Sequence, residues 1–259
     1  MGKLDGRVAA ITSGSTGIGR GIAEAFLAEG AKVVINGRDP EKGAKALSDI
    51  GAGENGFFVQ GDVTVREDVD RIVDGTVEHF GRIDIMVNNA GGLIETAPVK
   101  DLGDEAWDYA VKWNLYSAFW GSRRALNYMV PQEFGRIINI SSVEGKHGKP
   151  GIPAYVVCKH AMNGLTKAVA KEVGPSGVTS NAICPGLVWT DVLVATGPDS
   201  AAAMGITFDE MVDQFAQETA IKRITTVEEV AAIAVLLASD VGGGISGAMY
   251  SVDGGTAAW

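Results

Sequence analysis

The chain has 259 residues, 46% of them hydrophobic, and a formal net charge of −10 at neutral pH. This length fits one large domain or two small ones, and the share of apolar residues is enough for a sizeable core. The negative charge and the lack of any Lys/Arg block disfavour a protein that binds nucleic acid or anionic membranes.

The sequence offers no metal site and no membrane-directed segment. The two cysteines, Cys158 and Cys184, and the three histidines form no metal-ligand spacing. Residues 1–11 lack a signal-peptide layout, and no apolar run approaches the ~18 residues of a transmembrane helix. We therefore expect a soluble cytoplasmic protein with reduced cysteines and with neither a membrane nor a nucleic acid as partner.

Short apolar runs rich in β-branched residues predict seven strands, at 8–12, 32–36, 56–60, 83–88, 136–140, 178–183 and 248–252. Helical periodicity fills the intervals, for example at 66–80 and 227–239. This alternation predicts an α/β fold, a doubly wound Rossmann-like sheet of seven parallel strands with helices on both faces. No linker or repeat interrupts it, so we expect residues 1–259 to form a single domain.

Segment 191–221 departs from this rhythm. It is rich in alanine, glycine and small polar residues and turns helical at FDEMVDQFAQET, from residue 208. Ligands of open α/β sheets bind beyond the carboxyl ends of the strands, where a long excursion can serve as a lid. A substrate lid and a peripheral helical insert both fit this pattern.

A glycine-rich turn lies between the first predicted strand and the first predicted helix. It reads SGSTGIG at 13–19, with Gly14, Gly17 and Gly19. Glycine lets a pyrophosphate approach the amides at a helix N-terminus, where the helix dipole favours anions. In this context the turn indicates dinucleotide binding, although glycine-rich turns without a ligand share the pattern.

The end of the second predicted strand bears on the choice of nucleotide. NAD-binding proteins usually place a carboxylate there, against the ribose hydroxyls. Here the strand ends in Asn36 and Gly37, and Arg38 follows. An arginine can meet a 2′-phosphate with paired hydrogen bonds, whereas the charge of Asp39 opposes one. We predict NADP(H) over NAD(H), the alternative being that Arg38 is a solvated helix-entry residue.

Tyr155 and Lys159 are four residues apart in a predicted helix, at 153–174. Residues at this spacing share one face of a helix. A cation beside a phenol lowers the pKa of the phenol, which can then exchange a proton with an alcohol or a ketone. The pair alone is frequent by chance, so its weight comes from the motifs around it.

Those motifs resemble the short-chain dehydrogenase/reductase family, in its subgroup of single-domain chains, over essentially the whole sequence. The likeness rests on the glycine turn from Thr12 to Gly19, GDV at 61–63, NNAG at 88–91, Asn114, Ser142 with Tyr155 and Lys159, PGLVWT at 185–190 and SVDGG at 251–255. Ser13 stands where the family usually has its first glycine. If this position needs a positive φ, serine strains the turn unless Gly14 takes over that role.

The resemblance implies an oxidoreductase that interconverts a ketone and a secondary alcohol by hydride transfer to or from a nicotinamide. Tyr155 would be the general acid or base, Lys159 would lower its pKa and hold the ribose, and Ser142 would bind the substrate oxygen. Asn114 would hold a water that links Lys159 to solvent. The implied cofactor-binding residues are Ser13, Gly14, Ser15, Thr16, Gly17, Ile18, Gly19, Arg38, Asp62, Val63, Asn89, Ala90, Gly91, Tyr155, Lys159, Pro185, Gly186, Val188 and Thr190.

Parts of the chain look like the 3-hydroxybutyrate dehydrogenases of the family, which hold a small carboxylate with a glutamine, a histidine and a lysine. The corresponding positions here are Leu93, Glu144 and Ile152, and Glu144 would repel an anion. We therefore expect 3-hydroxybutyrate to be a poor substrate. Leu93, Ile94, Ile152 and Trp189 instead suggest a pocket for an apolar ketone or secondary alcohol.

Three other functions stay open at this point. A 3-oxoacyl thioester reductase would need a basic patch for an acidic carrier protein, for which Arg123, Arg124 and Arg136 are candidates. An NAD-dependent secondary-alcohol dehydrogenase would use the same catalytic residues, and a non-catalytic nucleotide-binding scaffold would not need them. The resemblance also implies a homotetramer.

Overall fold

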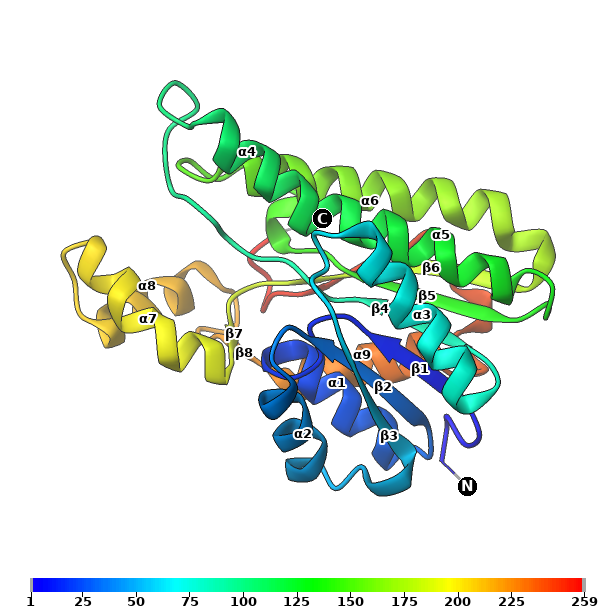
Figure 1. The fold of residues 1–259 in the computed structure, drawn as a ribbon. Helices are drawn as coiled ribbons and strands as arrows, with labels where there is room; N and C mark the ends of the chain where they lie inside the picture. The colour runs from blue at the N-terminus through cyan, green and yellow to red at the C-terminus, as the bar shows by residue number, and fades with distance from the viewer. Residues whose placement is uncertain (1, 258–259) are drawn as a thin grey trace.

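The computed structural model describes residues 2–257, in which seven parallel strands form one sheet in the order β3-β2-β1-β4-β5-β6-β9 (Figure 1). All seven predicted strands and the doubly wound fold are confirmed. The order reverses beside β1, so the carboxyl ends of β1 and β4 border a crevice of the kind that binds ligands in such sheets. The strands are β1 (Val8–Ile11), β2 (Lys32–Gly37), β3 (Gly56–Gln60), β4 (Ile85–Asn88), β5 (Gly135–Ile140), β6 (Val178–Pro185) and β9 (Met249–Val252).

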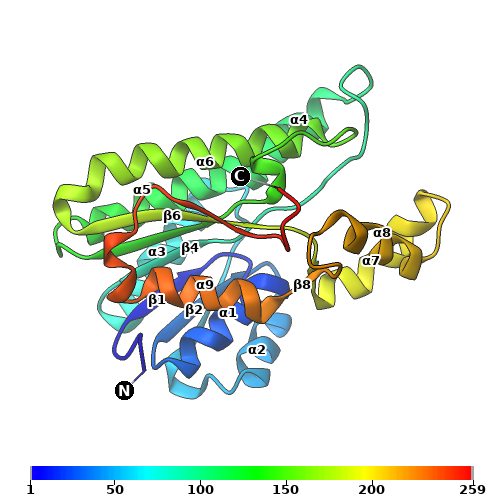
Figure 2. The same cartoon turned by 180° about the vertical axis from the view of Figure 1, so that it is seen from behind.

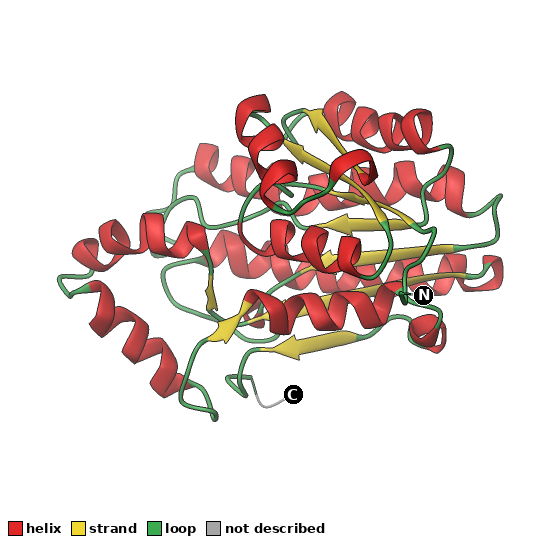
Figure 3. Ribbon diagram, turned by 90° about the horizontal axis from the view of Figure 1, so that it is seen from below, coloured by secondary structure: helices red, strands yellow, loops and turns green. Residues whose placement is uncertain are grey.

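Helices cover both faces of the sheet (Figures 2 and 3). One face carries α1 (Gly17–Ala28), α2 (Pro40–Asp49) and α9 (Val227–Ala238), and the other carries α3 (Arg66–Phe80), α5 (Ser117–Met129) and α6 (Pro153–Val173). Successive strand residues point to opposite faces. Ile11 accordingly packs in the core cluster beneath α1 and α9, and Ala10 packs in the cluster beneath α3 and α5.

The helical stretch from residue 104 to residue 129 is interrupted. It consists of α4 (Asp104–Val111), a wide π-helical turn at Lys112–Tyr116, and α5. Such turns often mark functional sites, and this one contains Asn114. Short 3₁₀ turns occur at Gly53–Asn55, Val143–Gly145, Gly174–Ser176 and Val241–Gly244.

The segment at 191–221 forms two helices, α7 (Asp191–Ala203) and α8 (Phe208–Glu218), which project from the body beyond the carboxyl ends of the strands (Figure 1). Only the second helix was expected from the sequence. At its base, β7 (Val188–Trp189) pairs with β8 (Thr225–Thr226). Two-residue strands have no periodicity and so give no sequence signal.

No helix of residues 2–257 is long and apolar enough to cross a bilayer.

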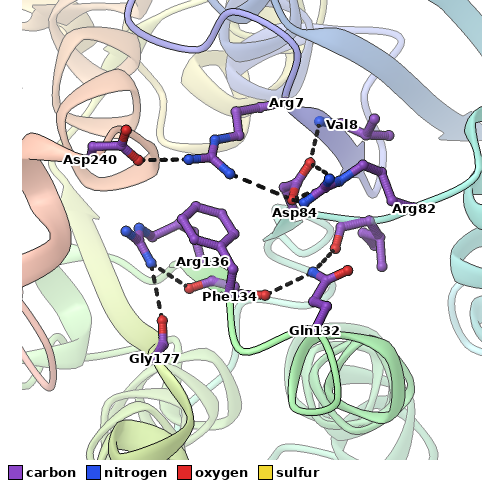
Figure 4. Close-up of polar contacts among 11 residues, drawn as sticks. Arg7, Val8, Arg82, Asp84, Gln132, Phe134, Arg136, Gly177 and Asp240 are labelled. Atoms are coloured by element: carbon purple, nitrogen blue, oxygen red, sulfur yellow. Dashed lines mark hydrogen bonds and ion pairs between the residues drawn. The ribbon is translucent and has the colours of Figure 1, made fainter.

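At the opposite, amino end of the strands, a charged cluster joins β1, β4 and β5 (Figure 4). The buried Asp84 accepts hydrogen bonds from the Val8 amide (3.0 Å) and from Arg82 (2.6 and 2.9 Å). Arg7 reaches Asp84 at 3.9 Å and Asp240 at 2.7 Å. The ring of Phe134 contacts the guanidinium groups of Arg7 (3.7 Å) and Arg136 (4.3 Å).

Because Asp84 is fully buried, Asp84→Asn should leave positive charge without its partner and cost about 3 kcal/mol of unfolding free energy. Urea unfolding measures this loss. Asp101→Asn removes an exposed ion pair, with Lys100 at 3.6 Å, and should change stability by less than about 0.5 kcal/mol. Equal effects of the two substitutions would show that the cluster is not a stabilising feature.

Candidate active site

The sequence-predicted cofactor residues gather at the carboxyl edge of the sheet. Residues 13–19 form the β1–α1 turn, and Arg38 follows β2. Asp62 and Val63 follow β3, Asn89, Ala90 and Gly91 follow β4, and Pro185 and Gly186 end β6. Val188 lies in β7 and Thr190 caps α7. A single edge therefore collects side chains that are up to 177 positions apart in the chain (from Ser13 to Thr190).

The β1–α1 turn carries real strain at Ser13, whose φ is +50°. The expectation that Gly14 could take over the positive φ is wrong, since Gly17 (φ +54°) is the other left-handed residue of the turn. Ser13 is held by bonds to its backbone: its amide donates to Asn36 Oδ1 (3.3 Å), and its carbonyl accepts from Asn89 Nδ2 (3.2 Å).

Two glycines of this turn leave no room for a side chain. A Cβ at Gly19 would lie 2.5 Å from Asn89 Nδ2 and 2.6 Å from the Ser13 carbonyl oxygen. One at Gly14 would lie 2.8 Å from Ile35 Cγ2. Glycine at these positions therefore lets the turn pack closely on the neighbouring strand ends, and the amide groups at the α1 N-terminus fit a dinucleotide pyrophosphate.

Sequence reasoning missed the structural role of Asn36. Its buried amide donates to the carbonyls of Val59 (3.1 Å) and Gly61 (3.0 Å) while its Oδ1 accepts from Ser13. Asn36 thus joins the ends of β1, β2 and β3. An asparagine at the end of a buried strand, where its side chain needs partners, is the signal that could have revealed it.

Beside it, the exposed Arg38 makes no ion pair with any residue of 2–257. The Asp39 carboxylate accepts from the amides of Glu41 (3.0 Å) and Lys42 (3.2 Å), which caps α2. Asp62 Oδ1 is occupied by Thr64, through its amide (2.9 Å) and its hydroxyl (2.8 Å).

The catalytic candidates come together from β5, α6 and the π-helical turn. Ser142, just beyond β5, donates its hydroxyl to the Glu144 carboxylate and accepts from the Glu144 amide (3.2 Å). Lys159 Nζ donates to the Ile140 carbonyl (2.8 Å) and lies 5.4 Å from the centre of the Tyr155 ring. A Cβ on Gly91 would lie 2.5 Å from Asn114 Oδ1 and 3.3 Å from Lys159 Nζ, so all these groups border one site.

The side chain of Asn114 is already engaged. Its Oδ1 accepts from the Gly92 amide (2.9 Å), and its Nδ2 donates to the carbonyls of Gly92 and Ala110 (both 3.1 Å). These bonds fix the strand that leaves β4. The Asn114 side chain is thus used in these bonds, and the expected water link from Asn114 to Lys159 stays a prediction.

Burial governs the titration of the catalytic pair. It raises the pKa of the Tyr155 phenol, with a further increase from the charge of Glu144, while a hydrogen bond with Ser142 opposes both. Burial also lowers the pKa of Lys159 to about 8. The Lys159 ammonium donates to the Ile140 carbonyl rather than to the phenol, so its expected lowering of the Tyr155 pKa stays a prediction.

Two hollows flank these groups. Tyr155 borders a small one of about 10 Å³, with Leu93 and Ile94. Glu144 borders a larger cavity of about 280 Å³, which is lined by Val143, Glu144, His147, Gly148, Lys149, Pro150, Gly186, Leu187, Phe215, Glu218, Thr219 and Thr256. The predicted substrate residues are thus divided between two places.

The two remaining substrate candidates, Ile152 and Trp189, line neither hollow. Ile152 is buried, and the half-exposed Trp189 packs near Phe208 of α8, with 6.1 Å between ring centres. The cavity lining contributed by α8, notably Phe215, was missed because the position of α8 beyond the carboxyl ends of the strands (Figure 1) is a tertiary feature. Among residues 2–257, no cluster of three or more His, Cys, Asp and Glu side chains could hold a metal.

A family model described as enoyl-(acyl carrier protein) reductase matches residues 13–257. The chain belongs to the short-chain dehydrogenase/reductase family. It is 38% identical to a D-beta-hydroxybutyrate dehydrogenase of Rhizobium meliloti, covering 96% of this chain and 98% of the relative. It is also 38% identical to (+)-borneol dehydrogenase 2 of Salvia officinalis, covering 98% and 90%.

A solved structure of the same fold supports this family assignment. An actinorhodin polyketide ketoreductase variant solved with NADPH has a TM-score of 0.93, 29% identity and full coverage of both chains. The predicted family and enzyme class are therefore confirmed: the chain is an oxidoreductase that acts on CH–OH groups and their ketones. This leaves no support for the scaffold without catalysis.

The lowered pKa of Lys159 predicts pH-dependent nucleotide binding. The ammonium is present below pH about 8 and is lost above it, so NADPH, an anion, should bind several-fold more weakly at pH 9.5 than at pH 7. Fluorescence titration across this range measures the dissociation constant. Lys159→Arg should flatten the profile because a guanidinium stays protonated.

Lys167→Arg, an exposed change on the same helix, is the control and should keep the wild-type profile. A pH dependence that persists in Lys159→Arg would assign the titration to another group.

Proposed function

We propose that the protein interconverts an apolar ketone and the corresponding secondary alcohol with NADP(H), using Tyr155 as the general acid or base. The strongest support is that Ser142, Tyr155 and Lys159 lie close together near the glycine-rich β1–α1 turn and the two hollows. The nicotinamide supplies the hydride chemistry when bound.

In the proposed mechanism, each side chain acts on a stated atom. The Tyr155 phenol gives its proton to the carbonyl oxygen in reduction and takes the hydroxyl proton in oxidation. The Ser142 hydroxyl fixes that oxygen within reach of the phenol. To donate to the oxygen, the Ser142 hydroxyl must release its bond to the Glu144 carboxylate.

The buried ammonium of Lys159 has two proposed tasks. In reduction it favours the phenolate that Tyr155 becomes when it gives up its proton. It also binds the ribose hydroxyls, for which it must exchange its bond to the Ile140 carbonyl. Because burial raises the pKa of Tyr155, proton loss near neutral pH requires the ammonium to leave the Ile140 carbonyl and approach the phenol.

The preference for NADP(H) is supported by the end of β2. The Arg38 guanidinium is exposed, while the Asp39 carboxylate is turned to the α2 amides and so does not face the nucleotide. The Ser15 hydroxyl lies 3.1 Å from the position of a Cβ on Gly37, which puts a further donor at this end. Together these groups suit a 2′-phosphate better than free ribose hydroxyls.

We expect NADPH to bind wild-type protein at least about tenfold tighter than NADH, because a charge-assisted bond to phosphate is worth ~1.5–3 kcal/mol. Arg38→Ala should abolish that preference by weakening NADPH alone. Fluorescence titration of both nucleotides measures it. Lys42→Ala, which removes an exposed charge from α2, is the control and should retain the preference. Equal or tighter binding of NADH to wild type would show that Arg38 does not read a phosphate.

The substrate class follows from the surroundings of Tyr155. Leu93 and Ile94 place apolar side chains near Tyr155, and the Glu144 carboxylate lies beside Ser142, where an anionic substrate group would be repelled. We therefore propose that 3-hydroxybutyrate is a poor substrate and that apolar ketones are good ones. The carrier-protein alternative loses its basic patch, since Arg136 is buried and Arg124 is paired with Asp74 (2.7 Å).

Tyr155→Phe should lower the turnover of an apolar ketone with NADPH by ~100-fold or more, because proton transfer of this kind contributes 10²–10⁴-fold. Nucleotide affinity should stay within about threefold, since the fold and Lys159 remain. Steady-state rates and fluorescence titration measure the two quantities.

Tyr250→Phe in β9 is the matched control and should keep turnover. Undiminished turnover in Tyr155→Phe would remove the phenol from the mechanism, and wild-type saturation at low millimolar 3-hydroxybutyrate would refute the substrate proposal.

We also propose that α7 and α8 act as a substrate lid, that the protein is cytoplasmic and that it forms a homotetramer. Support for the tetramer comes from the aromatic side chains exposed along α4, the π-helical turn and α5, which are Trp107, Tyr109, Tyr116 and Phe119. Support for the lid comes from Phe215 and Glu218 of α8, which line the larger cavity.

A further inference from the structure

The N-terminus of α1 is contacted by a carboxylate from a distant segment. The Gly17 amide donates to Asp191 Oδ1 at 2.8 Å, and Arg20 lies 3.9 Å from Asp191 Oδ2. Thr16, the residue that precedes the helix, provides no side-chain cap, and the first turn of α1 contains no acidic residue. Asp191, 174 positions away, supplies the negative charge that the helix end favours.

The same carboxylate begins α7. Asp191 is the first residue of this helix, and its Oδ1 also accepts from the Val192 amide (2.9 Å). Val192 Cγ2 lies 3.6 Å and Thr190 Cβ lies 3.9 Å from the position of a Cβ on Gly17. The first residues of α7 therefore contact the β1–α1 turn, and the Asp191 carboxylate accepts from one amide of α1 and one of α7.

We infer that Asp191 competes with the pyrophosphate of the nucleotide for the Gly17 amide, and so sets cofactor affinity and couples it to the lid. A diphosphate and a carboxylate are both anions and cannot accept the same amide proton at close range without strong repulsion. Binding of the nucleotide must therefore move Asp191 away from Gly17. This inference rests on the proposed nucleotide-dependent function.

The coupling to the lid follows from the position of Asp191. When its carboxylate leaves Gly17, α7 loses the hydrogen bond that holds its first turn to α1. Such coupling is reciprocal, so a lid displaced from α1 would leave the turn free for the nucleotide. The Asp191 side chain is 46% exposed, so water can solvate it once displaced, and the exchange is feasible.

The test compares nucleotide affinity in variants of the full chain. Asp191→Asn keeps an oxygen acceptor but loses the charge, and it should bind NADPH and NADH about three- to tenfold tighter than wild type at low salt. At ~1 M NaCl, where the screening length is about 3 Å, the gain should shrink to less than about twofold. Asp191→Glu keeps the charge and should gain nothing.

Asp49→Asn is the matched control. Asp49 also lies near Arg20, at 4.0 Å, but it makes no bond to Gly17, so its removal should change affinity by less than about twofold. Thermal unfolding of each variant without nucleotide confirms that it folds, and Asp191→Glu covers the case in which loss of charge destabilises the turn.

The outcomes distinguish failure of the proposed competition from failure of the proposed function. Unchanged or weaker binding by Asp191→Asn, or an equal gain in Asp49→Asn, would overturn the inference. Failure of wild type to bind either nucleotide would instead refute the proposed function, because the competition concerns affinity and not the existence of a site.

Discussion

A polar seam between α6 and the end of β5 is the constraint on which the site depends. Lys159 Nζ bonds to the Ile140 carbonyl (2.8 Å), and the Lys159 carbonyl accepts from Ser141 Oγ (3.2 Å). Farther along, Asn163 donates to the Gly145 carbonyl (2.8 Å), and Asn139 donates to Thr166 (2.9 Å). These bonds lie in a low-dielectric interior, where an unmade bond is costly, so they fix the helix in one register.

The seam also explains the electrostatics of the site. Lys159 is 2% exposed, and its ammonium has only a carbonyl as its partner, so the charged form is costly to bury. Burial accordingly lowers the pKa of Lys159. One carboxylate oxygen of Glu144 accepts the Ser142 hydroxyl. The charge of Glu144 adds to the effect of burial in raising the pKa of Tyr155. The site therefore combines the uncharged phenol of Tyr155 with the ammonium of Lys159, whose charge is poorly compensated. A bound anion that contacts Lys159 would restore the balance, which makes substrate chemistry dependent on nucleotide binding.

The sequence predicts the strands well because they depend on local order, and it also predicts the elements that carry Ser142, Tyr155 and Lys159. Each main strand is a short β-branched run, and the spacing of Ser142, Tyr155 and Lys159 follows directly from one strand end and one helix face. By contrast, α7 has alanine and glycine in place of an apolar stripe and holds Pro198 within it, so periodicity does not predict it. Its start is set by the Thr190 cap, which accepts from the Leu193 amide (3.0 Å).

The features that the sequence does not predict are contacts between segments. The positive φ of Ser13 is stabilised by Asn36 and Asn89, which come from two other strand ends, so no local rule could choose between Ser13 and Gly14. The separation of Glu144 from Leu93 and Ile94 into two hollows depends in the same way on contacts between distant segments, including α8.

The turn at Ser13 and the carboxylate of Asp191 both act on the N-terminus of α1. Ser13 is strained, and its strain persists because the Asn36 and Asn89 side chains hold the backbone on both sides of it. The amides beyond it are therefore rigidly presented, and they bind whichever anion reaches them. Among the described residues that anion is Asp191, carried by a segment that protrudes from the body (Figure 1). Because the Asp191 carboxylate is partly exposed and its amide partner is held in place, the contact can be exchanged for a nucleotide anion, as the proposed lid requires.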